Sequence, residues 1–154
     1  MLLLFLLLSL LMAVIEADVC QPYVQLEEKL KCGMDGYLIH YGLRNCRNFN
    51  NNETRKLFTP AGNNFVNCTT SCLVGRLSLY EKDPSMNCEI LSKDAFDSHT
   101  GCYIDCGFCK ICKTDKEALL KTYDLTDFFS FGAMKQVLHV AYSCSWFGLS
   151  CLSL

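Results

Sequence analysis

Apolar residues and cysteines recur every three or four positions through the middle of this chain. Between residues 65 and 80 this spacing places them on one face of an α-helix. Thr59-Pro60 is typical of a helix start, because proline is tolerated in the first turn. Asp83-Pro84 is expected to end the helix, since a residue before proline is disfavoured in the helical conformation. The pattern therefore predicts one long helix between these two proline signals.

Shorter patterns predict the remaining elements. Residues 24–30 are expected to form a short helix, and residues 131–147 the last helix. Ser85 is expected to cap a helix that runs toward Lys113. The polar segment 47–55, RNFNNNETR, indicates a loop or a frayed helix end.

A further helix start is predicted at Thr114-Asp-Lys-Glu117. This segment has the Thr-x-x-Glu form of a capping box and precedes an apolar run. No alternation of apolar and polar residues is long enough to indicate a strand. The predicted fold class is all-α, a helical bundle crosslinked by disulfides.

Both ends of the chain are apolar. Residues 1–14 have the length of a signal-peptide core, and the small Ala17 suits the last position before cleavage. We expect a secretory signal over residues 1–17 and a single helical domain over residues 18–154; the alternative is a buried N-terminal helix. Residues 137–154 contain four serines, two cysteines and a histidine, which favours a core-facing helix over a membrane helix or a lipid-anchor signal.

The cysteine content narrows the class of protein. All twelve cysteines of the 154 residues follow the expected signal, which indicates a disulfide scaffold in an oxidising compartment. The net charge is −2 and no basic cluster occurs, so neither nucleic acid nor an anionic membrane surface is expected as a partner. We therefore expect a secreted, extracellular protein without a membrane anchor.

Four of the cysteines lie close together, at Cys102, Cys106, Cys109 and Cys112. On a continuous helix they would share one face. In the cytosol such thiols could hold zinc or an iron–sulfur cluster. In an oxidising compartment they pair with one another, and no histidine lies within the cluster. We expect disulfides here and no metal or other cofactor.

Catalytic motifs are missing from the sequence. His40, His99 and His139 belong to no His-Glu-x-x-His motif, and no Gly-x-Ser-x-Gly occurs. A Cys–His protease pair is disfavoured, because the thiols are expected in disulfides. We expect no enzyme, and three histidines at the surface or partly buried.

Two sequons for N-glycosylation occur, Asn52-Glu-Thr54 and Asn67-Cys-Thr69. Asn52 lies in the polar segment and is expected to carry the main glycan. Asn67 lies on a predicted helix beside a cysteine, which favours an unused sequon.

The spacing of the cysteines carries a family resemblance. The steps along Cys72, Cys88, Cys102, Cys109 and Cys144 are 16, 14, 7 and 35 residues. Residues 58–73 follow the pattern Phe-x3-Gly-x2-Phe-Val-x5-Cys-Leu, a Cys-Tyr pair stands at 102–103, and Cys-x2-Asp-Gly stands at 32–36. Over roughly residues 32–144 the chain thus resembles the stanniocalcin family of secreted glycoprotein hormones. The cysteines without clear counterparts in that family are Cys68, Cys106, Cys112 and Cys151.

The resemblance implies a set of disulfides. The implied pairs are Cys72–Cys102, Cys109–Cys144, Cys32–Cys88 and, with a different N-terminal spacing, Cys20–Cys46. Helix geometry then suggests an extra bridge, because Cys68 precedes Cys72 by one turn and Cys106 follows Cys102 by one turn. In an antiparallel helix pair these two moves go the same way, which predicts Cys68–Cys106. The alternative is that these two cysteines pair elsewhere.

Two cysteines then have no assigned partner. Cys112 and Cys151 either pair with each other or bridge a homodimer.

The resemblance implies a hormone-like regulator of calcium and phosphate homeostasis that acts through an extracellular receptor. The alternatives are a secreted metalloprotease inhibitor, since some family members inhibit pappalysin-type proteases, and a structural extracellular helical protein. Saturable binding to intact cells would favour the hormone, and a stable complex with a metalloprotease would favour the inhibitor.

Overall fold

The computed structural model describes residues 18–123, 131–146 and 151, and every regular element in these residues is helical. The elements are α2 (Gln21–Leu30), the π-helix η1 (Tyr37–Leu43), α3 (Arg44–Asn50), α4 (Asn52–Arg55), α5 (Pro60–Lys82), α6 (Cys88–Asp105), α7 (Phe108–Ile111), α8 (Lys116–Thr122) and α9 (Phe131–Trp146). The predicted all-α fold with disulfide crosslinks is confirmed. The expected signal peptide, residues 1–17, lies outside the described residues, as do residues 147–150 and 152–154 of the apolar C-terminal stretch.

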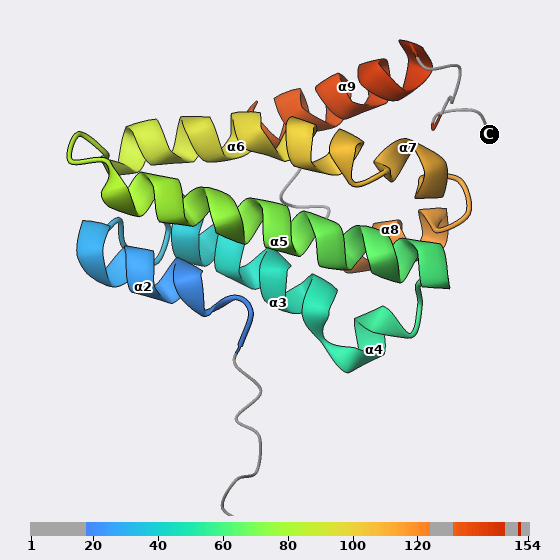
Figure 1. The fold of residues 1–154 in the computed structure, drawn as a ribbon, viewed down its shortest axis with the longest axis horizontal. Helices are drawn as coiled ribbons and strands as arrows, with labels where there is room; N and C mark the ends of the chain where they lie inside the picture. Colours follow the sequence, from blue (N-terminus) through green and yellow to red (C-terminus); the bar gives the residue numbers. More distant parts are fainter. Residues whose placement is uncertain (1–17, 124–130, 147–150, 152–154) are drawn as a thin grey trace, which may run out of the picture.

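The two longest helices, α5 and α6, run side by side in opposite directions and form the centre of the molecule (Figure 1). On one side of this pair, α9 packs along α6. On the other side, α2 and α3 pack against α5, and η1 packs against α2, α3 and α6. The short helices α7 and α8 lie near the end at which α5 begins.

The long helix α5 begins and ends where the proline signals predict. Thr59 directly precedes it, and the Thr59 Oγ1 accepts a hydrogen bond from the Gly62 N–H at 3.1 Å. Pro60 occupies the first turn, where its missing N–H costs nothing. The helix ends directly before Asp83.

Two clusters of buried side chains form the core. The first packs α2 and η1 against α5 and α6, and its members include Tyr23, Leu26, Leu38, Leu77 and Leu91. The second joins the start of α5 to the end of α6 and to α8 and α9, and its members include Phe58, Phe65, Val66, Tyr103 and Val140. Because α5 and α6 contribute to both clusters, they connect the two halves of the core.

The start of α6 differs from the prediction. Asn87 caps the helix, and its Oδ1 accepts hydrogen bonds from the backbone N–H groups of Glu89 and Ile90, both at 3.0 Å. The predicted cap, Ser85, is wrong. Its backbone N–H and its hydroxyl both donate to the Asp83 Oδ1, which closes a tight turn before the helix.

The expected continuous helix toward Lys113 is also wrong. The helix α6 ends at Asp105, and Gly107 follows with a φ of 88°, in the left-handed region that glycine adopts without strain. A new short helix, α7, begins at Phe108. Of the four clustered cysteines, Cys102 lies in α6 and Cys109 in α7, whereas Cys106 and Cys112 directly follow the ends of these helices. The expectation that all four share one helix face is therefore wrong.

The polar segment 47–55 is more helical than predicted. It contains the end of α3 and all of α4, separated only by Asn51. The Asn51 Oδ1 accepts a hydrogen bond from the Thr54 backbone N–H at 2.8 Å, so this asparagine caps α4. The expectation of a loop or a frayed end was wrong because asparagine side chains form hydrogen bonds with backbone groups at the ends of these helices.

The helix α8 forms where a helix start is predicted, but without the capping box. It begins at Lys116, directly after Asp115, and no side chain caps it. The Thr114 hydroxyl donates to the Asp115 Oδ2 at 2.8 Å and also contacts the Ile111 carbonyl oxygen at 3.3 Å. The capping-box prediction is therefore wrong.

Candidate functional site

Two disulfides, one helical turn apart, join α5 to α6. The inner bridge, Cys72–Cys102, has a Cα–Cα distance of 5.8 Å, and the outer bridge, Cys68–Cys106, has one of 5.6 Å. Both distances are ordinary for a disulfide. The outer bridge is the extra pair that helix geometry predicts, since the two helices are antiparallel.

The other eight cysteines are paired as well, and no cysteine is free. The pairs are Cys20–Cys46, Cys32–Cys88, Cys109–Cys144 and Cys112–Cys151. The first three are the pairs that the resemblance implies. For the fourth, the sequence left two outcomes open, and the structure joins the two cysteines within one chain.

These disulfides occupy the sulfur atoms that a metal site would need. Of the four clustered cysteines, Cys102 and Cys106 bond to α5, Cys109 bonds to α9, and Cys112 bonds to Cys151. Within the described ranges, no group of three or more histidine, cysteine or acidic side chains is placed to hold a metal ion.

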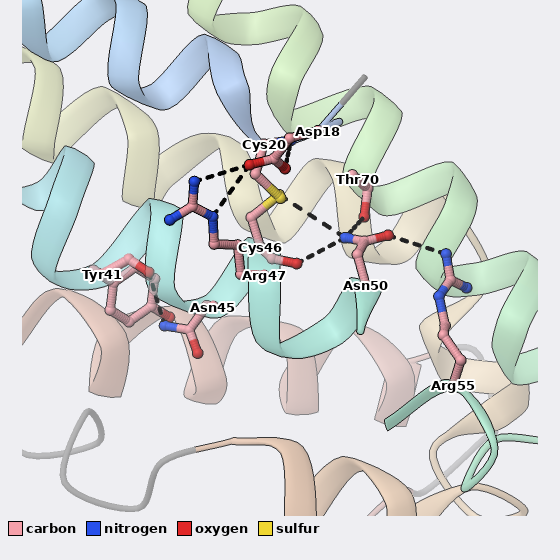
Figure 2. Close-up of a disulfide and its surroundings, with 9 residues drawn as sticks. All are labelled: Asp18, Cys20, Tyr41, Asn45, Cys46, Arg47, Asn50, Arg55 and Thr70. Atoms are coloured by element: carbon pink, nitrogen blue, oxygen red, sulfur yellow. Dashed lines mark hydrogen bonds and ion pairs between the residues drawn. A yellow bond between two sulfur atoms is a disulfide. The ribbon is translucent and has the colours of Figure 1, made fainter. Parts of the chain in front are cut away.

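Polar side chains surround the Cys20–Cys46 disulfide (Figure 2). The Arg47 guanidinium donates two hydrogen bonds to the Asp18 carboxylate, at 2.9 and 3.2 Å. The other Asp18 oxygen accepts the Cys20 backbone N–H at 3.0 Å. The hydrogen bond from Arg47 lowers the pKa of the Asp18 carboxyl. These contacts hold the segment before α2 against α3.

A second polar group ties α3, α4 and α5 together. The Asn50 amide donates to the Thr70 Oγ1 at 3.0 Å and to the Cys46 carbonyl at 2.8 Å, and Arg55 donates to the Asn50 Oδ1 at 3.0 Å (Figure 2). Arg55 also donates to the Asn67 Oδ1. Burial lowers the pKa of the Arg55 guanidinium.

The two sequon asparagines have different surroundings. Asn52 is exposed at the first residue of α4. Asn67 is exposed on α5, but its Oδ1 accepts the hydrogen bond from Arg55, and Thr69 of the same sequon is buried. The folded chain therefore presents the Asn52 sequon more openly than the Asn67 sequon.

The three histidines lie apart. His40 and His139 are exposed, as expected. His99 is only 3% exposed, which is a correction to the expectation that all three lie at the surface or are partly buried. A signal for this burial was present, since His99 follows Ala95 by one turn on the inward face of α6.

Aromatic rings enclose His99. The rings of Tyr37, Tyr41, Phe96 and Tyr103 have centroids within about 6 Å of the imidazole centroid. The His99 Nδ1 donates to the Ala95 carbonyl at 2.6 Å, so the Nε2 is left to accept a long, 3.5 Å contact from the Tyr37 hydroxyl. Burial lowers the pKa of His99 to about 4. The imidazole is neutral near pH 7 and belongs to the core.

Acidification is therefore expected to destabilise the fold through His99. Its pKa is about 4 in the folded chain, against 6.5 for an ordinary histidine. Between these values the unfolded chain takes up a proton and the folded chain does not, so stability is lost as the pH falls through this window. From pH 7 to about pH 4.5 we expect the free energy of unfolding to fall by roughly 2 kcal/mol from this group.

Denaturant titrations at the two pH values measure this loss, with a His99→Phe variant as the control. In that variant the dependence on pH over the same window should be reduced. An equal dependence in both proteins would assign the effect to other groups.

A small cavity lies beside the His99 cluster, between the α2, η1 and α3 layer and helices α5 and α6. Its volume is about 40 Å³, and its lining includes Tyr41, Phe49, Thr69, His99 and Tyr103. The lining has no carboxylate, lysine or arginine. A space of this size holds about three water molecules and is far below the size of a typical ligand pocket.

The exposed face of α9 carries two large side chains. Leu138 is 62% exposed and Tyr142 is 70% exposed, and their spacing of four residues puts them on one face of the helix. Gln136, Val140 and Cys144 face inward. Among the described residues, the apolar stretches of helix are too short to cross a membrane.

Comparison with protein-family models gives no match, and no curated protein or solved structure proves similar to the chain.

Proposed function

We propose that this chain is a secreted, hormone-like glycoprotein of the stanniocalcin type that acts through an extracellular protein partner. One observation carries the proposal: the pairs Cys32–Cys88, Cys72–Cys102 and Cys109–Cys144 are those that the family resemblance implies. By the same resemblance, its role is the regulation of calcium and phosphate homeostasis.

The arrangement of the described residues suits recognition by another protein better than it suits chemistry. Disulfides connect the segments around α2, α3, α5, α6, α7 and α9, so the surface between them is held in a fixed shape. A fixed surface binds a partner without the entropic cost of ordering loops. The cavity beside His99 is small, and its lining carries no carboxylate, lysine or arginine. His99, the histidine that lines it, is neutral and packed among aromatic rings.

Binding of the labelled, secreted protein to intact cells tests the proposal. We expect saturable binding that an excess of unlabelled protein displaces. The matched control is the same chain after reduction and alkylation, which has the same composition but no crosslinks and should not bind. Absence of saturable binding, together with a stable inhibitory complex with a purified pappalysin-type protease, would contradict the hormone proposal and favour the inhibitor.

Secretion leads to a prediction about the glycan. Asn52 is exposed and its sequon is accessible, so we expect Asn52→Gln to remove most of the mass that a glycosidase releases from the secreted protein. The matched variant Asn67→Gln should leave this mass nearly unchanged. Mass spectrometry of both variants before and after glycosidase treatment measures the effect. A large loss in Asn67→Gln would reverse the assignment.

A further inference from the structure

The outer bridge, Cys68–Cys106, differs from the other disulfides in exposure. All twelve cysteines lie in the described residues, and Cys68 is the one that is exposed, whereas the others are buried or half-buried. Its partner Cys106 is half-buried, whereas Cys102 of the inner bridge is only 1% exposed. Access to a sulfur atom is a main determinant of how fast a thiolate attacks a disulfide. On this ground we expect a reductant in solution to reach the outer bridge first.

The inner bridge makes the outer one dispensable for holding α5 to α6. Both bridges join the same two helices, one turn apart. Next to them the Phe65 and Tyr103 rings pack edge to face, with centroids 5.7 Å apart. When the outer bridge opens, the inner bridge and this ring pair still fix the register of the helices.

The position of Cys106 also limits the damage that opening would cause. Cys106 directly follows the last residue of α6, and Gly107 already ends the helix with its left-handed φ of 88°. If the two sulfur atoms separate, Cys106 can move without breaking hydrogen bonds in the interior of α6. The structural change is confined to the junction between α6 and α7.

We propose that Cys68–Cys106 is a reductive modification site, at which a dithiol of the Cys-x-x-Cys oxidoreductase class or a small dithiol opens the bridge in the folded protein. One reductant thiolate attacks the Cys68 Sγ, the Cys68–Cys106 bond breaks, and the Cys106 thiolate leaves and takes a proton from water. The second reductant thiol, as its thiolate, then displaces Cys68 and closes the disulfide of the reductant. Two electrons pass from the dithiol to the bridge.

The product is a folded chain with thiols at Cys68 and Cys106, and the Cys68 thiol lies on the outer surface of α5. There it is available for a mixed disulfide with a second protein. The other bridges resist the same attack to different degrees. Cys20, Cys109, Cys112 and Cys144 are all buried, so the closest competitor is Cys32–Cys88, in which both residues are half-buried.

Limited reduction followed by alkylation tests the proposal. The native protein is treated with dithiothreitol for a short time, the thiols are trapped with N-ethylmaleimide, and labelled peptides are quantified. We expect Cys68 and Cys106 to be labelled at least about tenfold faster than any other pair, with the helical circular-dichroism signal unchanged. Labelling that is spread over several pairs, or that accompanies loss of the helical signal, would overturn the proposal.

Three double variants test separately whether the outer bridge is the accessible one and whether the inner bridge makes it dispensable. Cys68→Ser with Cys106→Ser should abolish the fast labelling phase, whereas the matched control Cys32→Ser with Cys88→Ser should retain it. In Cys72→Ala with Cys102→Ala the outer bridge is the remaining disulfide between α5 and α6, and its reduction should then be accompanied by loss of helical signal. Unchanged fast labelling in the first variant would show that the fast thiols belong to another pair.

Discussion

Complete reduction of the disulfides is expected to unfold the chain at room temperature. Six bridges crosslink the described helices, and a native disulfide contributes about 2–4 kcal/mol in a protein of this kind. The whole stability of a domain is only about 5–15 kcal/mol. Even if the contributions add incompletely, their sum is comparable with the total. The two apolar clusters alone are not expected to keep the helices together.

The measurement is circular dichroism of the protein after full reduction and alkylation, with mass spectrometry to count the alkylated cysteines. We expect most of the helical signal to be lost, together with the cooperative thermal transition. Protein in which only Cys68 and Cys106 have been alkylated is the matched control and should remain folded. A fully alkylated chain that still unfolds cooperatively would show that the apolar core suffices.

Four of the six disulfides are pairs that the family resemblance implies, and helix geometry added a fifth, Cys68–Cys106. Once Cys72 and Cys102 are paired on antiparallel helices, the positions one turn away must also lie close together. The partner of Cys112 was not predictable in this way. Its partner Cys151 lies beyond residues 131–147, the bounds predicted for the last helix, and no known pair fixed its position, so the sequence left an intrachain and an interchain pair open.

Helix ends were predicted well only where the signal is local. Thr59 caps α5 through its own backbone neighbours, and proline fixes the first turn. Ser85 failed as a cap because Asp83 binds its hydroxyl, and Asn87 takes its place. The single helix expected across Gly107 does not form, because Gly107 adopts the left-handed conformation and ends α6, although the spacing of the cysteines is helical.

The π-helix η1 had no signal in the pattern of apolar residues. Its wide turn brings Gly42 against the Tyr23 ring so closely that a Cβ atom at this position would overlap the ring. The burial of His99 beside this segment likewise depends on which helix packs over it. Such features follow from contacts between segments that are distant in the sequence, and the local pattern of residues does not predict these contacts.

Beside Thr114, where no capping box forms, the Asp115 carboxylate makes a long-range contact that is expected to contribute strongly to the stability of the fold. Asp115 is only 3% exposed, and its carboxylate reaches the start of α5. It accepts the Thr59 backbone N–H at 2.6 Å, the Thr59 hydroxyl at 2.9 Å and the Thr114 hydroxyl at 2.8 Å. Gly62 lies so close that a Cβ atom there would overlap the Asp115 carboxylate. This contact joins the segments that precede α5 and α8.

Substitution of this carboxylate is therefore expected to destabilise the fold strongly. Asp115→Ala removes three hydrogen bonds to a charged group and leaves the Thr59 N–H without its partner, which should lower the free energy of unfolding by about 3 kcal/mol. Gly62→Ala should also destabilise, because the new methyl group pushes the carboxylate away. The matched control is Asp105→Ala, which removes an exposed carboxylate at the end of α6 and should change stability by less than about 0.5 kcal/mol. Denaturant unfolding with the disulfides intact measures all three variants. If Asp115→Ala proved as stable as Asp105→Ala, the bridge between the starts of α5 and α8 would contribute nothing to the fold.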